Sequence, residues 1–197
     1  MAGVNEAIVR EFFEAHGLLV RQQRKFVAPS AAEDEQVDFV VWNPRAPSET
    51  RALPFVLAAG DVDRLRLAAV SVKGWHTNTM SAALLASDPE VARFTDPALL
   101  ERAARSLGLE PPLTCVLIVP WLPQTRAGRE EAQAALRARG VDAVLSFREV
   151  LGDLIVRTQP NRNYARSDVL QMLRILKNYE LLKDPSLELF RPGRRRK

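Results

Sequence analysis

The spacing of hydrophobic residues changes along this chain, and each change marks a predicted element. Apolar side chains recur at helical spacing from Ile8 to Phe13, which predicts a helix over residues 4–16 that Gly17 ends. Short apolar runs bounded by turn residues predict strands instead. These strands are expected within residues 18–29, 37–44, 67–76, 112–123 and 141–147.

Helical segments fill most of the intervals between the later strands. Asp88 before Pro89 and Asp96 before Pro97 each fit a helix N-cap followed by proline in the first turn. A further helix over residues 128–139 joins the last two strands. Strand, crossover helix and strand in succession indicate parallel neighbours. We therefore predict an α/β fold with a mixed central β-sheet flanked by helices.

A C-terminal helical extension is predicted beyond the sheet. Residues 1–158 are assigned to the α/β domain, residues 159–190 to the extension and residues 191–197 to a basic tail. Ser167 or Asp168 can cap the last helix. Its expected apolar face consists of Leu170, Leu173, Leu176 and Tyr179. This face is expected to dock on the domain or to pair with a second copy in a homodimer.

The apolar run from Leu67 to Val72 contains the main anomaly of the chain, because it ends in Lys73. Side chains alternate between the faces of a strand, so Ser71 and Lys73 share one face. Burying an ammonium group without a partner costs several kcal/mol. Lys73 is therefore expected to have an anionic partner, a route to solvent or a chemical role.

Two carboxylates also occupy apolar surroundings. Asp38 interrupts the hydrophobic run between Val37 and Trp42, where a charge is expected only if it is paired or binds a metal. Glu6 falls at the margin of the apolar face of the first helix. Such a glutamate is usually solvated, and only a nearby cation or metal gives it a function. Residues 45–66, in contrast, are expected to be a polar connection with a short helical turn.

The composition indicates which cellular compartment to expect and how large the hydrophobic core can be. The chain has 197 residues, of which 47% are hydrophobic, enough for one domain with a sizeable core. No apolar run approaches the roughly 20 residues that span a bilayer, and the first residues lack the pattern of a signal peptide. Cys115 is the single cysteine, so no internal disulfide is possible. A reducing cytoplasm and no membrane association are expected.

The net charge of +4 is concentrated in the tail. Residues 191–197 carry five positive side chains, which leaves the rest of the chain close to neutral. A basic tail can attract phosphates through counterion release, although a solvated end is the commoner case. Nucleic-acid binding by the folded body therefore needs local groups, for which Arg21, Arg24 and Lys25 are candidates.

The order of the predicted elements resembles a known superfamily. A helix precedes two strands, the second with an aspartate, and then come a strand with Ser-x-Lys, a helical region, a strand, a helix and a strand. The segments NEAIVREFFEAHG, VDF and SVKGW carry the similarity. This arrangement resembles the PD-(D/E)xK phosphodiesterases over residues 4–150, and the order carries as much of the resemblance as the letters. The resemblance implies a restriction-endonuclease-like fold that hydrolyses nucleic acid.

The same resemblance implies roles for four residues. It points to Asp38 and Glu6 as ligands of Mg²⁺ or Mn²⁺, and to Lys73 as the group that orients water or neutralises the developing charge. Ser71 stands where the family has an acidic residue, which is a departure from the motif. A hydroxyl carries no charge, so metal binding is expected to be weaker in this chain.

Other groups can compensate for that loss. Asp61 and Asp63 precede the strand that ends in Lys73, and the phosphates of the substrate are also possible ligands. Ser71 together with Lys73 also suggests a serine-lysine hydrolase, but the sequence offers no recognisable oxyanion hole, so this is the weaker hypothesis.

Aromatic residues near the ends of three strands suggest contacts with bases. Trp42, Trp75 and Trp121 can form an aromatic rim that stacks on bases, or they can close the ends of the core. His76 follows Lys73 by three residues and can contact phosphate, although a loop histidine is more often a simple surface residue.

Two functions stay open at this point. The first is a metal-dependent phosphodiesterase that acts on DNA or another nucleic acid and is weakened by the loss of one carboxylate. The alternative is a catalytically inactive nuclease-fold module that binds nucleic acid or a protein partner. In that case Asp38 and Lys73 form a buried ion pair across neighbouring strands.

Overall fold

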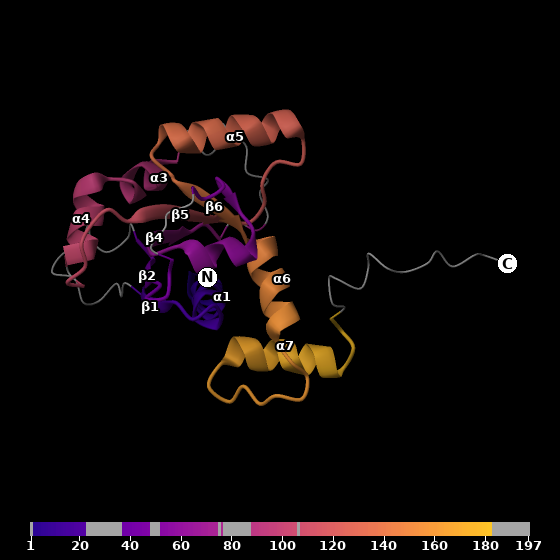
Figure 1. The fold of residues 1–197 in the computed structure, drawn as a ribbon. Helices are drawn as coiled ribbons and strands as arrows, with labels where there is room; N and C mark the ends of the chain where they lie inside the picture. The colour runs from indigo at the N-terminus through magenta and orange to yellow at the C-terminus, as the bar shows by residue number, and fades with distance from the viewer. Residues whose placement is uncertain are drawn as a thin grey trace.

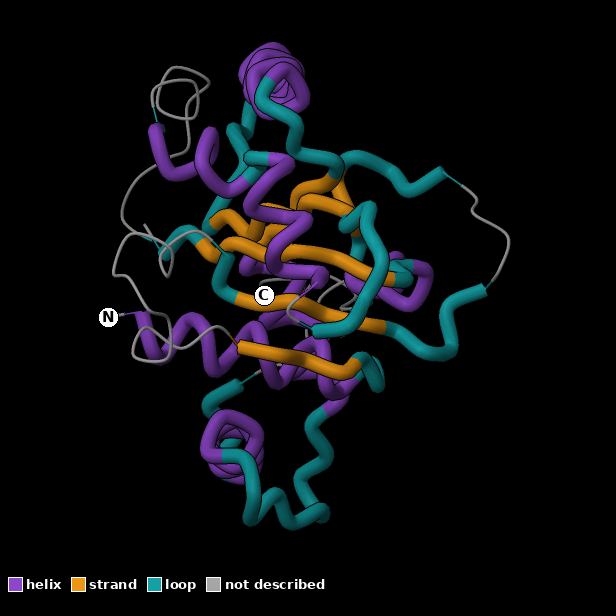
Figure 2. The backbone as a smooth tube through the Cα atoms, turned by 90° about the vertical axis from the view of Figure 1, so that its left-hand side faces the viewer, coloured by secondary structure: helices purple, strands orange, loops and turns teal. Residues whose placement is uncertain are grey.

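The computed structural model describes residues 2–22, 37–47, 52–74, 76, 88–105 and 107–182. Within these ranges the fold is α/β, with a six-stranded mixed sheet between two layers of helices (Figures 1 and 2). The strands are β1 (Leu19–Gln22), β2 (Phe39–Trp42), β3 (Val56–Leu57), β4 (Leu67–Val72), β5 (Thr114–Val119) and β6 (Ala143–Ser146). Their order across the sheet is β1-β2-β4-β5-β6-β3. The predicted fold class is confirmed at this level.

Strand β4 is the place where two kinds of pairing meet. It runs antiparallel to β2, with Phe39 opposite Val70, and β1 continues the antiparallel half beyond β2. On its other side β4 runs parallel to β5, and the parallel half continues through β6 to β3. The predicted crossover from β5 to β6 therefore joins parallel neighbours.

Helices cover both faces of the sheet. One face carries α1 (Ala2–Ala15), α6 (Phe147–Arg157) and the 3-10 helix η1 (Ala59–Arg64), and the other carries α3 (Pro89–Phe94), α4 (Pro97–Arg105) and α5 (Arg126–Ala138). Alternation along β4 divides its side chains between them, because Val70 packs toward α1 and α6 whereas Ala69 packs toward α3, α4 and α5. Each layer thus has its own hydrophobic core.

The capping residues expected from the sequence do cap helices. Asp88 accepts the backbone N–H of Glu90 at 2.8 Å and begins α3. Ser167, and not Asp168, caps α7 (Asp168–Asn178) by accepting the N–H of Leu170 at 3.1 Å.

Two element boundaries differ from the prediction. The connection over residues 45–66 contains β3, in which Val56 pairs with Val144 of β6 at the sheet edge. Two residues are too few to show a strand period, so the sequence carries no signal for this strand. Asp38 lies directly before β2 and not within it, which places its side chain at the end of the sheet.

Helix α7 docks on the body with one face and exposes another. Val169, Leu170 and Leu173 pack against the core that α1 and α6 share. Tyr179, predicted on the same face, is 74% exposed. The prediction followed a strict three-residue spacing, which drifts by about 60° at each step on a helix of 3.6 residues per turn. Docking is thus observed, and the homodimer stays a prediction.

No helix within the described ranges is both long and apolar enough to cross a membrane.

Cys115 provides a test of the core between the sheet and α5. Its side chain is buried in β5, and this burial raises the pKa of the thiol to about 12, with the Asp142 carboxylate adding to the rise. Because the thiolate is the reactive form, we expect no reaction with a thiol reagent at pH 8 in the native state. Labelling across a urea series should follow the loss of far-UV circular dichroism. Fast labelling in native buffer would contradict this packing.

Candidate functional site

The carboxylate of Asp38 is fixed over the end of β4. Its backbone N–H donates to the carbonyl of Val70 at 3.0 Å, and its Oδ2 accepts the N–H of Val72 at 2.6 Å. The Ser71 hydroxyl lies near enough to this carboxylate to lower its pKa. Asp38 and Ser71 are therefore brought together, as strand order and alternation predict.

The surroundings of Asp38 oppose its ionisation. Burial raises the pKa of this carboxyl above its ordinary value, and the nearby Glu6 carboxylate raises it further. The Val72 N–H, the Lys73 ammonium and the Ser71 hydroxyl act in the opposite direction without cancelling the rise. The site thus disfavours a second negative charge, which is the condition that a bound cation would relieve.

Glu6 reaches this region from the helix on the other side of the sheet. It lies on α1, and its Oε2 accepts a hydrogen bond from the Gln22 side chain at the end of β1, at 2.5 Å. Gln22 pairs with Phe39, which directly follows Asp38, so the two carboxylates share one neighbourhood. The structure therefore brings Glu6 and Asp38 together, although their roles as ligands stay a prediction.

Lys73 has the anionic partners that its burial demands. Its side chain is 5% exposed, its ammonium donates to Glu90, and Nζ lies 3.7 Å from Oδ2 of Asp88. Both carboxylates belong to the first turn of α3. This Oδ2 of Asp88 is buried and accepts no hydrogen bond, so the ion pair is the contact that compensates it.

The sequence prediction missed this acidic pair. It assigned Asp88 to capping, which is correct, but the contact with Lys73 spans 15 residues and depends on how α3 packs on the sheet. The sequence offered one signal for this contact: Lys73 needed an anionic partner, and Asp88 is a carboxylate that follows it at the start of a predicted helix. Burial of Lys73 was predictable, whereas the identity of its partners was not.

Asp61 and Asp63, the suggested substitutes for the missing acidic residue, make contacts elsewhere. Asp61 accepts the N–H of Ala58 and pairs with Arg64 at 3.3 Å. Asp63 bonds to His16 at 2.7 Å. The hypothesis that they compensate for Ser71 is not supported by these contacts.

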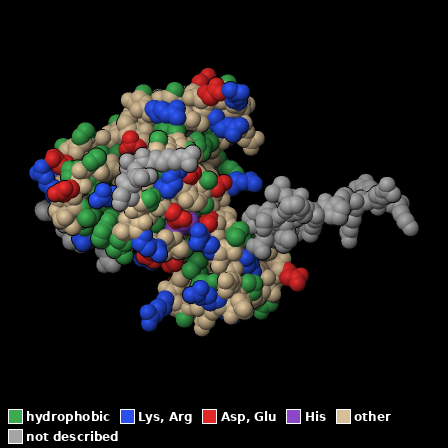
Figure 3. Space-filling model, viewed as in Figure 1, with side chains coloured by type: hydrophobic (Ala, Val, Ile, Leu, Met, Phe, Trp, Pro, Cys, Tyr) green, Lys and Arg blue, Asp and Glu red, His purple; other side chains and the backbone are tan. Residues whose placement is uncertain are grey.

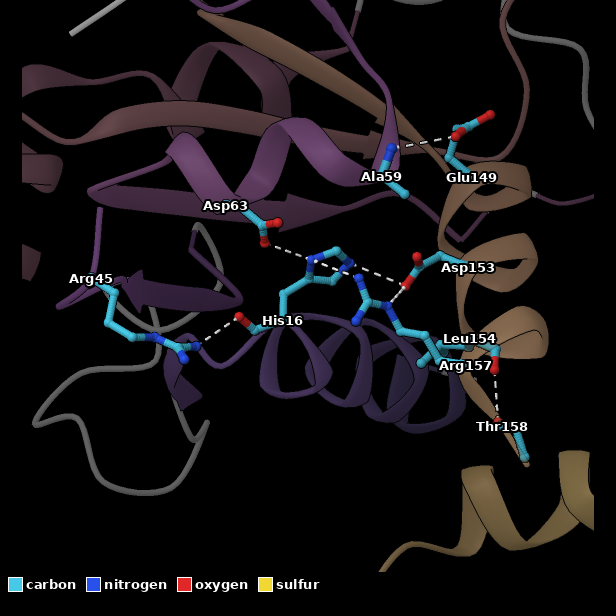
Figure 4. Close-up of polar contacts among 9 residues, drawn as sticks. All are labelled: His16, Arg45, Ala59, Asp63, Glu149, Asp153, Leu154, Arg157 and Thr158. Carbon is cyan, nitrogen blue, oxygen red and sulfur yellow. Dashed lines mark hydrogen bonds and ion pairs between the residues drawn. The ribbon is translucent and has the colours of Figure 1, made fainter. Parts of the chain in front are cut away.

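His16 has a structural role. Its side chain is fully buried, with Nδ1 2.7 Å from Asp63 of η1 and Nε2 3.1 Å from Asp153 of α6 (Figure 4). Arg157 donates to the same Asp153 at 2.7 Å, and Arg45 donates to the carbonyl of His16 at 3.2 Å. These contacts join the end of α1 to two other elements.

The candidate nucleic-acid contacts are only partly described. Arg21 is exposed on the edge strand β1, and His76 is exposed although its Nε2 lies 2.9 Å from the Asn5 side chain. Arg24, Lys25 and Trp75, like the basic tail, lie outside the described residues. On the face drawn in Figure 3, the coloured basic and acidic side chains are interspersed over the surface. Their roles stay predictions.

The suggested aromatic rim is wrong in one of its members. Trp42 pairs with Leu67 at the start of β4, so it lies at the opposite end of the sheet from Lys73. Trp121 follows the parallel strand β5 and does lie at the end where β4 leads into Lys73. Antiparallel pairing of β2 causes the difference, because the ends of antiparallel neighbours point in opposite directions.

The carboxylates present fit one kind of metal site. Within the described ranges, no three His, Cys, Asp or Glu side chains are grouped so that they could hold an ion. Mg²⁺ usually retains water and binds through one or two carboxylates together with substrate phosphates. Glu6 and Asp38 match that smaller requirement, and they do not match a cage made by protein alone.

Replacing Asp38 with Asn tests the electrostatics of the site. A raised native pKa means that the folded state binds more protons, so this group lowers stability as pH rises above its ordinary value of 3.8. Asn cannot ionise and can still accept the Val72 N–H. We expect Asp38→Asn to be more stable than wild type at pH 7, with the difference vanishing near pH 4.

Urea denaturation across this pH range measures that difference. Glu110→Gln, which alters an exposed carboxylate, is the matched control and should show no such trend. A constant difference between wild type and Asp38→Asn at every pH would exclude the proposed origin of the effect.

A double-mutant cycle tests the contact between Lys73 and Asp88. Asp88→Ala should cost about 2–3 kcal/mol, more than the ~1 kcal/mol of a lost N-cap and less than a fully broken buried pair, since the exposed Glu90 stays beside Lys73. In a Lys73→Met background the cost should fall to about 1 kcal/mol.

Urea denaturation of the four proteins gives the coupling energy. Asp96→Ala, which removes the equivalent cap of α4, should cost about 1 kcal/mol in both backgrounds. Equal costs for Asp88→Ala with and without Lys73 would show that the two charges do not interact.

Comparisons with known proteins add no further constraint on this site. No protein-family model, curated protein or solved structure matches the chain. The function of this chain must therefore be inferred from its own residues and their contacts.

Proposed function

We propose that this chain is a metal-dependent phosphodiesterase that acts on nucleic acid. The observation that supports it most is the grouping of Asp38, Ser71 and Lys73 at the adjoining ends of β2 and β4, with Glu6 in electrostatic contact. Two carboxylates can hold a cation and an ammonium group can stabilise developing negative charge, and both functions suit the hydrolysis of a phosphodiester.

We also propose that the fold is restriction-endonuclease-like. Helix α1, the antiparallel strands β1, β2 and β4, and a helical crossover to the parallel strand β5 follow one another in the order of a restriction-endonuclease-like domain. In that arrangement the aspartate and the lysine of the motif come from two neighbouring strands of the sheet. Asp38 and Lys73 lie at the adjoining ends of the neighbouring strands β2 and β4, which supports this assignment over an unrelated mixed sheet.

Each side chain has a distinct part in the proposed reaction. Glu6 and Asp38 would bind the ion, Mg²⁺ or Mn²⁺, which supplies a Lewis acid for the phosphoryl oxygen. Ser71 orients the Asp38 carboxylate through its hydroxyl. Lys73 positions water or neutralises the charge that develops on phosphate. Binding of phosphate at Lys73 competes with Glu90 for the same ammonium.

Glu90 also offers a substitute for the acidic residue absent at position 71. Its carboxylate is 62% exposed and contacts the Lys73 ammonium from the start of α3. A carboxylate so placed can turn toward water or an ion without disturbing the core, whereas Asp88 is buried and committed to the helix cap. Glu90 is thus a better candidate for compensation than Asp61 or Asp63.

A second function is favoured by one specific observation. Lys73 and Asp88 are each 5% exposed, and they neutralise one another at 3.7 Å. A satisfied buried pair needs no chemistry to explain it. The alternative is therefore a catalytically inactive module of the same fold that binds nucleic acid or a protein partner.

Turnover and metal binding together separate the two functions. We expect Mn²⁺-dependent cleavage of single-stranded, duplex or branched DNA, with Asp38→Asn and Lys73→Met each reducing kcat by roughly 10²-fold or more. Calorimetry should detect Mn²⁺ binding to wild type and its loss in Asp38→Asn. Glu110→Gln should behave as wild type.

Two outcomes would favour the binding module. No heat with Mn²⁺ and no cleavage by wild type would remove the enzymatic proposal. If Ser71→Glu then produced cleavage, the chain would be a nuclease-like scaffold whose activity was lost with that carboxylate.

A further inference from the structure

A cavity of about 710 Å³ opens at the end of the sheet where the parallel strands finish. Residues that follow β5 and β6 form its two sides, and His76, shortly after β4, adds to its wall. The cavity lining includes Ala59, His76, Trp121, Arg148, Glu149 and Asp153. The volume lies within the range typical of small-molecule sites.

The cavity lies where the chain changes sides of the sheet. After β5 the chain continues to α5, which covers the face shared with α3 and α4. After β6 it continues to α6, which covers the opposite face with α1. When the connections that follow two adjacent parallel strands leave toward opposite faces of the sheet, a crevice forms at the carboxyl ends of those strands. Ligands of open α/β sheets usually bind in this crevice.

The walls suit a flat aromatic ligand. Trp121 is 48% exposed, so much of its indole surface is free for stacking. The His76 ring is held edge-on to Phe147, with ring centroids 4.7 Å apart, and its Nε2 lies 2.9 Å from Asn5. A side chain held from two sides presents a fixed surface to a ligand.

The charges favour a base over a phosphate. Glu149 and Asp153 both line the cavity, whereas Arg148 is the one arginine among its described lining residues (Figure 4 shows the two carboxylates). Asp153 is paired with Arg157, whereas the contact of the Glu149 carboxylate among the described residues is a long one, 3.4 Å from the N–H of Ala59. A carboxylate repels phosphate and accepts hydrogen bonds from the exocyclic amine of cytosine or adenine.

The cavity is connected to the candidate catalytic residues by short segments. His76 lies three residues after Lys73, and Asn5, which contacts His76, directly precedes Glu6. The candidate catalytic residues and the cavity thus lie at the same end of the sheet, an arrangement that allows both to contact one nucleic-acid strand.

We propose that the cavity binds one unpaired nucleobase of that strand, stacked on Trp121 and hydrogen-bonded to Glu149. This inference rests on the proposed function for the position of the phosphate. A base inside a duplex cannot enter such a cavity unless it leaves the stack. The preferred substrate is thus single-stranded or carries an unpaired nucleotide, with cytosine or adenine favoured over thymine at that position.

Binding of short labelled oligonucleotides, measured by fluorescence anisotropy in EDTA, tests the cavity apart from catalysis. Trp121→Ala should weaken binding of single-stranded oligo(dC) about tenfold or more, the effect of one lost stacking contact, and should leave duplex binding unchanged. Trp121→Phe should retain most of the affinity. Glu149→Gln should reduce the preference for oligo(dC) over oligo(dT).

Tyr179→Ala is the matched control, because it removes an exposed aromatic side chain from α7 and should not change binding. Circular dichroism and urea midpoints establish that each variant is folded. Equal binding of single strands by wild type and Trp121→Ala would overturn the inference, as would equal losses in Trp121→Ala and Trp121→Phe.

Different results would reject the proposed base site and the proposed phosphodiesterase activity. Trp121-dependent binding of single strands without cleavage by wild type would support the cavity and reject the phosphodiesterase. Asp38-dependent cleavage that is indifferent to Trp121 and Glu149 would support the phosphodiesterase and reject the cavity as the base site.

Discussion

The burial of one ammonium group, that of Lys73, constrains the structure around it. This side chain follows a strand that is covered on both faces, and a lysine in such a place must keep compensating charges within a few ångströms. Asp88 and Glu90 provide them from the start of α3. Asp38, directly before β2, adds a third carboxylate within electrostatic range. The packing of α3 on this end of β4 is therefore linked to the charge of Lys73.

The elements predicted with most success are those whose pattern is local. Apolar periodicity identified α1, and a hydrophobic run identified β5, which the structure shows to be buried on both faces. Asp88 and Ser167 were predicted as caps because capping depends on neighbours two or three residues away. Strand β3 was missed because its two residues pair only through tertiary contact with β6.

In the candidate site too, the features set by a local pattern were predicted, and those set by packing between layers were not. Alternation along β4 placed Ser71 and Lys73 on one face, and the order of strands placed Asp38 beside them. The partners of Lys73 could not be predicted, since they depend on the orientation of α3 above the sheet. The position of Trp42 depended on strand direction, which periodicity alone does not determine. Contacts within one strand were thus more predictable than contacts between layers.

The arrangement of Glu6 and Asp38 is unfavourable for folding by itself. Two carboxylates share one neighbourhood, and the pKa of Asp38 is raised by burial and by that second charge. Such a pair persists only where other contacts fix the elements that carry it. At the far end of α1, His16 makes those contacts with Asp63 and Asp153, and so restricts the helix on which Glu6 lies (Figure 4). A cation bound by the two carboxylates would offset this electrostatic cost, and that is the role which the proposed function gives to Glu6 and Asp38.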